Sequence, residues 1–189
     1  KMVWLILGLI LFHGIHSLRM IAPDWRNAQY EAMGENKWKS VYSLVSIIAL
    51  VILVYGYSQA RLEAGFIYIP PQWGALVAIV LMAFAFILMT FNVRSSRFRK
   101  ITKHPFLMAI ILWSIAHLLA NGDTASVLLF GTFLLWAIAN YLFVSRRGDP
   151  LPPVAPLWQD LAAIIFGLIL WVVFITFGHE WLFGVAPIA

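Results

Sequence analysis

The chain has 189 residues, of which 62% are hydrophobic and only 11% are charged. A soluble domain is about half apolar and about a quarter charged, so this composition excludes an ordinary soluble protein. The sequence contains no cysteine, which excludes disulfides, thiolate metal sites, iron–sulfur clusters and covalently attached c-type haem. The 13 Lys and Arg residues outnumber the 8 Asp and Glu residues, but they lie beside apolar segments. This placement indicates a membrane surface and no nucleic-acid partner.

Six segments contain no charged residue and are long enough, or nearly so, to cross a bilayer. A spanning helix needs about 20 apolar residues at a rise of about 1.5 Å per residue. The six segments are residues 2–18, 40–60, 72–93, 105–122, 124–145 and 161–179. They predict an all-α, polytopic membrane protein, a six-transmembrane-helix bundle that forms a single transmembrane domain over residues 1–189 in the lipid bilayer.

Basic residues are distributed unequally between the two sides of the membrane. With six spans, the connections 19–39, 94–104 and 146–160 lie on one side and carry eleven Lys and Arg residues, whereas the other side has Lys1 and Arg61. The positive-inside rule therefore predicts that both termini lie outside the cytoplasm, and are periplasmic if the source is a Gram-negative bacterium.

Residues at the helix ends refine these boundaries. Ser40 and Asp160 are expected to cap the second and sixth helices, and Pro105 suits the first turn of the fourth. Gly122 is expected to end the fourth helix with a positive φ, while Asp123 caps the fifth. The fourth and fifth helices are then joined by a tight turn.

Histidines are the only ionisable side chains well inside the predicted helices, where such groups are costly and need a partner or a function. His13 and His16 are three residues apart and share a face of the first helix. Trp113, His117 and Asn121 follow at intervals of four, so an indole, an imidazole and an amide lie on one stripe of the fourth helix. No helix interior contains Asp or Glu, which argues against a di-iron carboxylate site.

These histidines leave two interpretations open. A single histidine at membrane depth ordinarily makes an interhelical hydrogen bond. Three that face the interior also suit a metal ion or a b-type haem, because neutral imidazole is the commonest metal ligand and haem iron needs one or two of them. Near the helix ends, His179 suits an interfacial anchor or a proton relay. Several basic residues are suited to bind a haem propionate or a lipid phosphate, and they are equally explained by membrane topology alone. These residues are Arg19, Arg26, Arg94, Arg97, Arg99 and Lys103.

Three stretches resemble the NnrU family of membrane proteins. The first is Leu11-Phe12-His13-Gly14-Ile15-His16-Ser17-Leu18-Arg19, and the second runs from Trp38 to Ser46. The third is the most diagnostic, and it joins His104-Pro105 to Trp113, His117 and Asn121-Gly122-Asp123 in fixed spacing. Together the three motifs extend over the first five predicted helices.

The resemblance implies two kinds of function. Bacterial NnrU proteins are associated with denitrification, that is, with nitrite and nitric oxide metabolism. The related plant and cyanobacterial branch is the 15-cis-zeta-carotene isomerase, a b-haem protein whose ligand histidines resemble His16 and His117. His104 matches a further family histidine, but a cysteine of the isomerase has no counterpart here. Length and motifs resemble the bacterial branch more closely, which implies a multi-pass protein of the bacterial inner (plasma) membrane.

The depth of the histidines bears on which residue of the first helix is the ligand. At about 1.5 Å per residue, His117 lies about 18 Å from the start of its helix and His16 about 20 Å from the start of a helix that enters from the other side. His13 therefore matches the level of His117 better and is the alternative ligand, with Arg19 approaching a propionate.

We expect one haem b between the first and fourth helices, with a role in nitrogen-oxide metabolism implied only by the resemblance. The expected iron ligands are His16 and His117, with His13 as the alternative in the first helix. Further cofactor-binding candidates are Arg19, His104, Trp113 and Asn121. Two alternatives stay open: a haem-dependent cis–trans isomerase of a carotenoid-like polyene, and a non-enzymatic accessory subunit bound to other subunits of a larger membrane complex.

Overall fold

A computed structural model describes residues 1–91, 97–148, 154 and 156–188 of the chain. All the regular elements in these residues are helices, apart from an isolated β-bridge between Phe66 and Asp123. The chain forms two compact units. Unit 1 comprises Lys1–Tyr68 and Gly122–Thr132, and unit 2 comprises Ile69–Asn121 and Phe133–Ala189.

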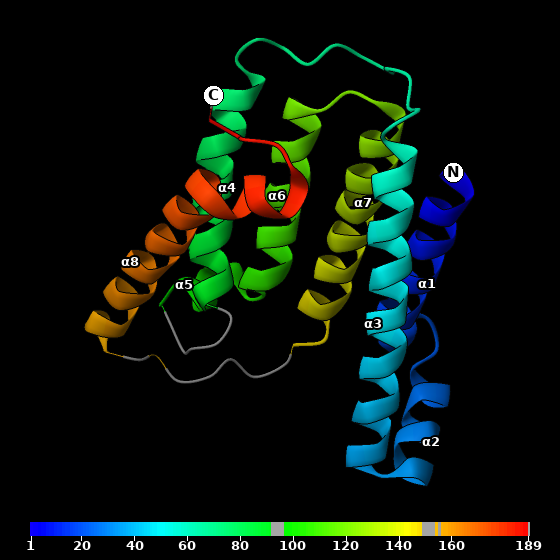
Figure 1. Ribbon diagram of the computed structural model, residues 1–189. Coiled ribbons are helices and arrows are strands. Elements are labelled where there is room, and N and C mark those ends of the chain that lie inside the picture. Colours follow the sequence, from blue (N-terminus) through cyan, green and yellow to red (C-terminus); the bar gives the residue numbers. More distant parts are fainter. Residues whose placement is uncertain (92–96, 149–153, 155, 189) are drawn as a thin grey trace. The chain divides into compact units, whose positions relative to one another are not determined.

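Unit 1 is built on the contact between the long helices α1 (Met2–Ile21) and α3 (Glu35–Ala60), which lie side by side in Figure 1. Glycines allow the two backbones to approach closely. A Cβ atom on Gly8 would lie 2.5 Å from Cα of Leu53, and one on Gly56 would lie 2.4 Å from the backbone nitrogen of Leu5. Small residues at a helix contact are typical of membrane proteins, where backbone packing takes the place of the hydrophobic effect.

Helix α2 (Pro23–Met33) lies within residues 19–39, which were expected only to connect the first two spans. Pro23 occupies its first turn, where the missing N–H costs nothing, and Gly34 with a φ of 77° separates it from α3. The guanidinium of Arg26 lies over the rings of Tyr30 and Trp38, 5.0 and 5.8 Å from their centroids. These cation–π contacts hold α2 against α3 and engage the charge of Arg26.

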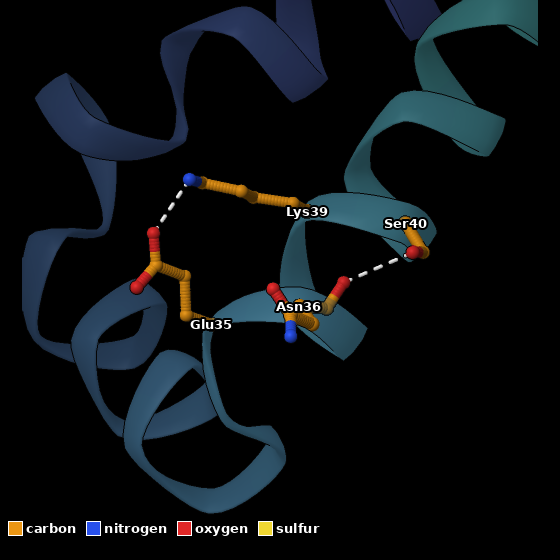
Figure 2. Close-up of polar contacts among 4 residues, drawn as sticks. All are labelled: Glu35, Asn36, Lys39 and Ser40. Atoms are coloured by element: carbon orange, nitrogen blue, oxygen red, sulfur yellow. Dashed lines mark hydrogen bonds and ion pairs between the residues drawn. The ribbon is translucent and has the colours of Figure 1, made fainter.

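Helix α3 begins at Glu35 and not at Ser40, and the prediction that Ser40 caps it is wrong. Figure 2 shows the hydroxyl of Ser40 donating a hydrogen bond of 2.9 Å to the carbonyl oxygen of Asn36, one turn back inside the helix. Lys39 pairs with Glu35 at 2.5 Å in the same turn. A Glu four residues before a Lys favours helix, so α3 extends beyond its apolar segment.

Unit 2 is organised around α4 (Gly74–Phe91), which packs against α6 (Pro105–Ala120) and α8 (Leu157–Val173). Glycines again mark the close approaches: a Cβ on Gly74 would lie 2.1 Å from the Leu119 carbonyl oxygen, and one on Gly167 would lie 2.8 Å from Cα of Ile87. The remaining elements are α5 (Arg97–Thr102), a π-helix η1 (Phe174–Gly178) and α9 (His179–Phe183). Helix α7 (Thr124–Arg146) contributes its first residues to unit 1 and the others to unit 2.

The structure tests the other predicted helix ends. Pro105 begins α6 as predicted, and the carboxylate of Asp123 caps α7 by accepting a 2.9 Å hydrogen bond from the N–H of Ser126. The positive φ predicted for Gly122 is wrong, because α6 already ends at Ala120 with an extended residue after it. Asp160 is not a cap either: it lies buried in the first turn of α8 and pairs with Arg97 at 3.2 Å.

Five helices in the described part of the chain are long and apolar enough to cross a membrane. They are Met2–Ile21, Glu35–Ala60, Gly74–Phe91, Thr124–Arg146 and the continuous helical segment Leu157–Phe183. Helix α6 is also apolar but has only 16 residues. The end of the predicted segment 72–93 and Arg94 lie outside the described residues. The architecture is that of a polytopic, all-helical membrane protein.

Candidate functional site

The two histidines of α1 have the same backbone-anchored arrangement. Nδ1 of His13 is 2.9 Å from the Leu9 carbonyl oxygen, and Nδ1 of His16 is 2.7 Å from that of Phe12. Because a carbonyl oxygen can only accept, Nδ1 donates in both, and the lone pair of the neutral imidazole is on Nε2. Histidines that bind metals commonly donate their other ring N–H to a carbonyl in this way, which fixes both the tautomer and the ring orientation.

Aromatic rings from α1 and α3 surround His16. The Phe12 ring stacks on the imidazole with a centroid distance of 4.2 Å, and the ring of Tyr42 meets it edge-on at 5.8 Å. Tyr42 in turn lies 6.4 Å from the ring of buried Trp38. His16 is thus half-buried in an apolar, aromatic environment, while Arg19 is exposed in the last turn of α1.

The predicted stripe of α6 forms one connected group. Nδ1 of His117 donates to the Trp113 carbonyl oxygen at 2.8 Å, and the side-chain amide of Asn121 donates to the His117 carbonyl oxygen at 2.9 Å. The Trp113 ring lies 5.2 Å from the imidazole and also meets the ring of Phe133 in α7 edge-on at 5.4 Å. Like the α1 histidines, His117 therefore has its lone pair on Nε2.

His104 lies at the opposite end of α6 from this group. It immediately precedes the helix, and its ring meets that of Tyr141 edge-on at 6.1 Å. The thirteen positions that separate it from His117 correspond to about 20 Å of helix. Although both belong to one sequence motif, the structure does not bring His104 to the group around His117.

His179 was expected near a helix end, and it is the first residue of α9, directly after the π-helix. The rings of Phe174 and Phe183 meet its imidazole edge-on, with centroid distances of 5.8 and 5.1 Å. Nδ1 of His179 donates to the Val185 carbonyl oxygen at 2.7 Å, so its lone pair is on Nε2 as well.

The structure shows the partners of Arg97 and Arg26, two of the basic residues considered for an anionic ligand. Arg97 forms an ion pair with buried Asp160, and Arg26 lies over two aromatic rings. The candidates divide between the units as follows: His13, His16 and Arg19 belong to unit 1, and His104, Trp113, His117, Asn121 and His179 belong to unit 2.

The donor set fits a haem better than a bare metal ion. In the described residues no group of three or more His, Cys, Asp or Glu side chains could hold a metal ion, and a structural zinc site needs about four such ligands. A porphyrin supplies four nitrogens of its own, so one or two imidazoles with Nε2 lone pairs complete the coordination of its iron. Backbone-anchored imidazoles on apolar helices meet that requirement.

Comparison with known proteins agrees with the motifs. The model of a family described as NnrU protein matches residues 4–187. No curated protein and no solved structure matches the chain. The family match covers the helices of both units, and therefore includes every candidate residue.

Proposed function

Because the chain belongs to the NnrU family, we propose that it is a membrane protein that binds one b-type haem through His117 and acts in nitrite and nitric oxide metabolism. The observation that best supports haem binding is the hydrogen bond from Nδ1 of His117 to the Trp113 carbonyl oxygen. It commits one ring nitrogen to the backbone, and the other ring nitrogen would hold the haem iron, in the last turn of an apolar helix that has no carboxylate or thiol of its own.

The neighbours of His117 have supporting roles in this proposal. The carbonyl of Trp113 holds the imidazole in one tautomer, and the indole ring beside it excludes water from the ligand. Asn121 donates to the carbonyl oxygen of His117 and steadies the last turn of α6, where carbonyl groups otherwise have no helical partner. When bound, a b-type haem supplies an iron centre that can take a small ligand or exchange an electron.

The family resemblance also implies that a histidine of α1 would hold the haem. His16 is the residue that the motif indicates, and His13 is the alternative one turn away. Both have the same anchored tautomer as His117, and each is therefore chemically competent as a ligand.

The association with nitrogen oxides is carried over from the family. Nitric oxide is a small neutral molecule that partitions into lipid, and it can reach a haem among membrane helices without a polar channel. We further propose six spans in a bacterial inner membrane, with α6 as the short fourth span and both termini periplasmic. The excess of basic residues on the opposite side supports this orientation.

The test is the His117→Ala variant, compared with His104→Ala as a matched control at the other end of the same helix. We expect the wild type and His104→Ala to purify from membranes with a Soret band and a stoichiometric haem content. His117→Ala should lose most of its haem while it still inserts in the membrane, because no Cys, Met or Tyr lies at the neighbouring positions of that helical face.

Two outcomes would contradict the proposal. Full haem content in a well-folded His117→Ala protein would exclude His117 as a ligand. A colourless wild-type protein that co-purifies in a fixed ratio with another membrane complex would instead favour an accessory subunit without haem.

A further inference from the structure

A short helix at one end of unit 2 concentrates positive charge. Helix α5 contains the basic residues Arg97, Arg99 and Lys100, and Lys103 follows it directly. Residues 64–122 of the sequence contain no Asp or Glu, so no acidic residue nearby along the chain neutralises these charges. In Figure 1, α5 lies at the end of unit 2 where α6 and α8 begin.

The structure neutralises one of these charges and leaves two others open to a ligand. The guanidinium of Arg97 pairs with the buried carboxylate of Asp160 in α8 at 3.2 Å. Lys100 and Lys103 are both exposed, and neither forms an ion pair with any residue that the structure describes. Their two ammonium groups can therefore bind an anion that comes from outside the chain.

The other face of α5 is apolar and lies against the end of a helix of membrane-spanning length. The ring of Phe98 stacks on that of Phe91, the last residue of α4, with a centroid distance of 4.8 Å. Ile101 lies one turn from Phe98 on the same face and is 77% exposed. Lys100 is two positions from Phe98, which places it on nearly the opposite side of the helix. This arrangement suits a membrane interface, where apolar side chains lie among acyl chains and charged ones reach the phosphates.

The backbone of Lys103 has an unusual conformation. Its φ of 56° is the only positive φ of a non-glycine residue in the part of the chain that the structure describes. Two hydrogen bonds fix this turn: the N–H of Lys103 donates to the Arg99 carbonyl oxygen at 2.8 Å, and that of His104 donates to the Thr102 carbonyl oxygen at 2.6 Å. Asparagine adopts a left-handed conformation more readily than lysine does. The charge of Lys103 therefore explains its presence better than its fit to the turn.

We propose that Lys100 and Lys103 bind the phosphate of an anionic phospholipid, with Ile101 among the acyl chains of the same leaflet. The unpaired ammonium groups complement the charge of the headgroup. A free phosphate ion would use these charges but leave Ile101 in water, whereas a lipid accommodates both. The positive-inside rule explains basic residues on this side of the membrane, but it requires no preference for one headgroup. Such a preference is what the proposal adds, and it does not depend on the haem.

The experiment measures by native mass spectrometry how tightly the purified full-length protein binds phosphatidylglycerol and phosphatidylcholine in a mild detergent. We expect phosphatidylglycerol to bind more tightly, and added salt to weaken its binding. One basic residue near the membrane surface contributes enough for about a fivefold change in affinity. Lys100→Gln and Lys103→Asn should therefore each weaken the binding of phosphatidylglycerol about fivefold. The matched control is Lys37→Gln, which removes an exposed positive charge at the start of α3 and should leave the binding unchanged.

Two of the variants separate lipid binding from folding and from charge alone. Lys103→Asn relieves an unfavourable backbone conformation, so its melting temperature should equal or exceed that of the wild type while its lipid affinity falls. Ile101→Asn keeps every charge but removes the apolar contact, and it should also weaken the binding of phosphatidylglycerol. A lysine with a purely structural role would not give this combination of unchanged stability and reduced affinity.

Several results would overturn the inference. Equal affinity of the wild type for the two lipids would do so, as would unchanged binding of phosphatidylglycerol in both lysine variants. Inorganic phosphate that displaces the lipid at the same concentration would assign the two lysines to a free anion instead. An acidic protein that co-purifies with the wild type, in place of the lipid, and not with the lysine variants would assign them to a protein partner. None of these results involves haem content, so each leaves the proposed function standing.

Discussion

Gly122 shows how a single missing side chain determines a contact between distant segments. A Cβ at this position would lie only 1.9 Å from the Tyr68 carbonyl oxygen. The carbonyl oxygen of Gly122 accepts a 2.8 Å hydrogen bond from the N–H of Ile67, and Thr124 donates to the carbonyl oxygen of Gly65. The residue is therefore needed for a close backbone approach, and not for a left-handed conformation.

We expect Gly122→Ala to destabilise the protein by about 1–3 kcal/mol or more, because the methyl group must displace backbone and not a flexible side chain. Thermal unfolding in detergent, followed by circular dichroism, measures the change. Gly131→Ala is the matched control, since a Cβ there meets nothing within 4 Å and the substitution lies inside α7. Equal melting temperatures for the two variants would contradict this account of Gly122.

At the scale of elements, the contact between α1 and α3 carries the histidines of unit 1. Gly8 and Gly56 bring the helix backbones together at two levels, and Leu5 and Leu53 are buried between them. Further along α1, the contact continues through the ring of His16 against Tyr42 of α3. The packing of this helix pair thus determines where the α1 histidines lie.

Gly8→Ala should weaken this helix pair, since its Cβ would come within 2.5 Å of Cα of Leu53. A loss of about 1–3 kcal/mol is expected from overpacking. Gly14→Ala in the same helix has nothing within 4 Å and should be neutral or slightly stabilising, because Ala has the higher helix propensity. The free energies of unfolding of both variants are measured in a mild detergent to which a denaturing detergent is added stepwise. A Gly8→Ala variant as stable as the wild type would show that the two helices can move apart without a loss of stability.

The end of α8 shows how the packing of side chains accompanies an irregular helical backbone. A regular helix of the length of Leu157–Phe183 would continue straight, but the π-helix Phe174–Gly178 interrupts it. A Cβ on Gly178 would lie 2.9 Å from a ring carbon of Phe174, so the Phe174 ring packs closely against this turn. Directly after the π-helix, His179 begins α9, and its Nδ1 donates to the Val185 carbonyl oxygen at 2.7 Å.

For the whole molecule, topology decides which face of the membrane each site opens to. If six helices span, a reporter fused after Arg147 should be cytoplasmic, and one fused at the C-terminus should be periplasmic. A further fusion after Arg61 should also report the periplasmic side. The reporters are alkaline phosphatase, which is active only outside the cytoplasm, and green fluorescent protein, which is fluorescent only inside.

A cytoplasmic C-terminus would mean that one of the six apolar segments does not cross the membrane. We expect α6 to be the helix that does not span in that case, because its 16 residues make it shorter than the five helices of spanning length. That result would leave the hydrogen bond between His117 and Trp113 intact, but it would remove the argument that the site lies at membrane depth.

Features that depend on neighbouring residues were predictable from the sequence. The apolar segments predicted the long helices, because a membrane span is recognised by composition over about 20 residues. Pro105 and Asp123 were assigned correctly, since their roles depend on the first turn of a helix. The structure also shows the predicted stripe of Trp113, His117 and Asn121, because a helix brings every fourth residue together.

Features that depend on distant residues were decided by the tertiary structure. Helix α2 is stabilised by the contact of Arg26 with Trp38, and Asp160 is buried because Arg97 reaches it from another helix. Gly122 is needed because the backbone of Tyr68 approaches it closely, and rules for helix capping do not predict such a contact. The π-helix Phe174–Gly178 is the clearest case: in the sequence it is part of one apolar segment, and only the structure shows that the α-helix is interrupted there, because backbone irregularities arise from packing and not from local composition.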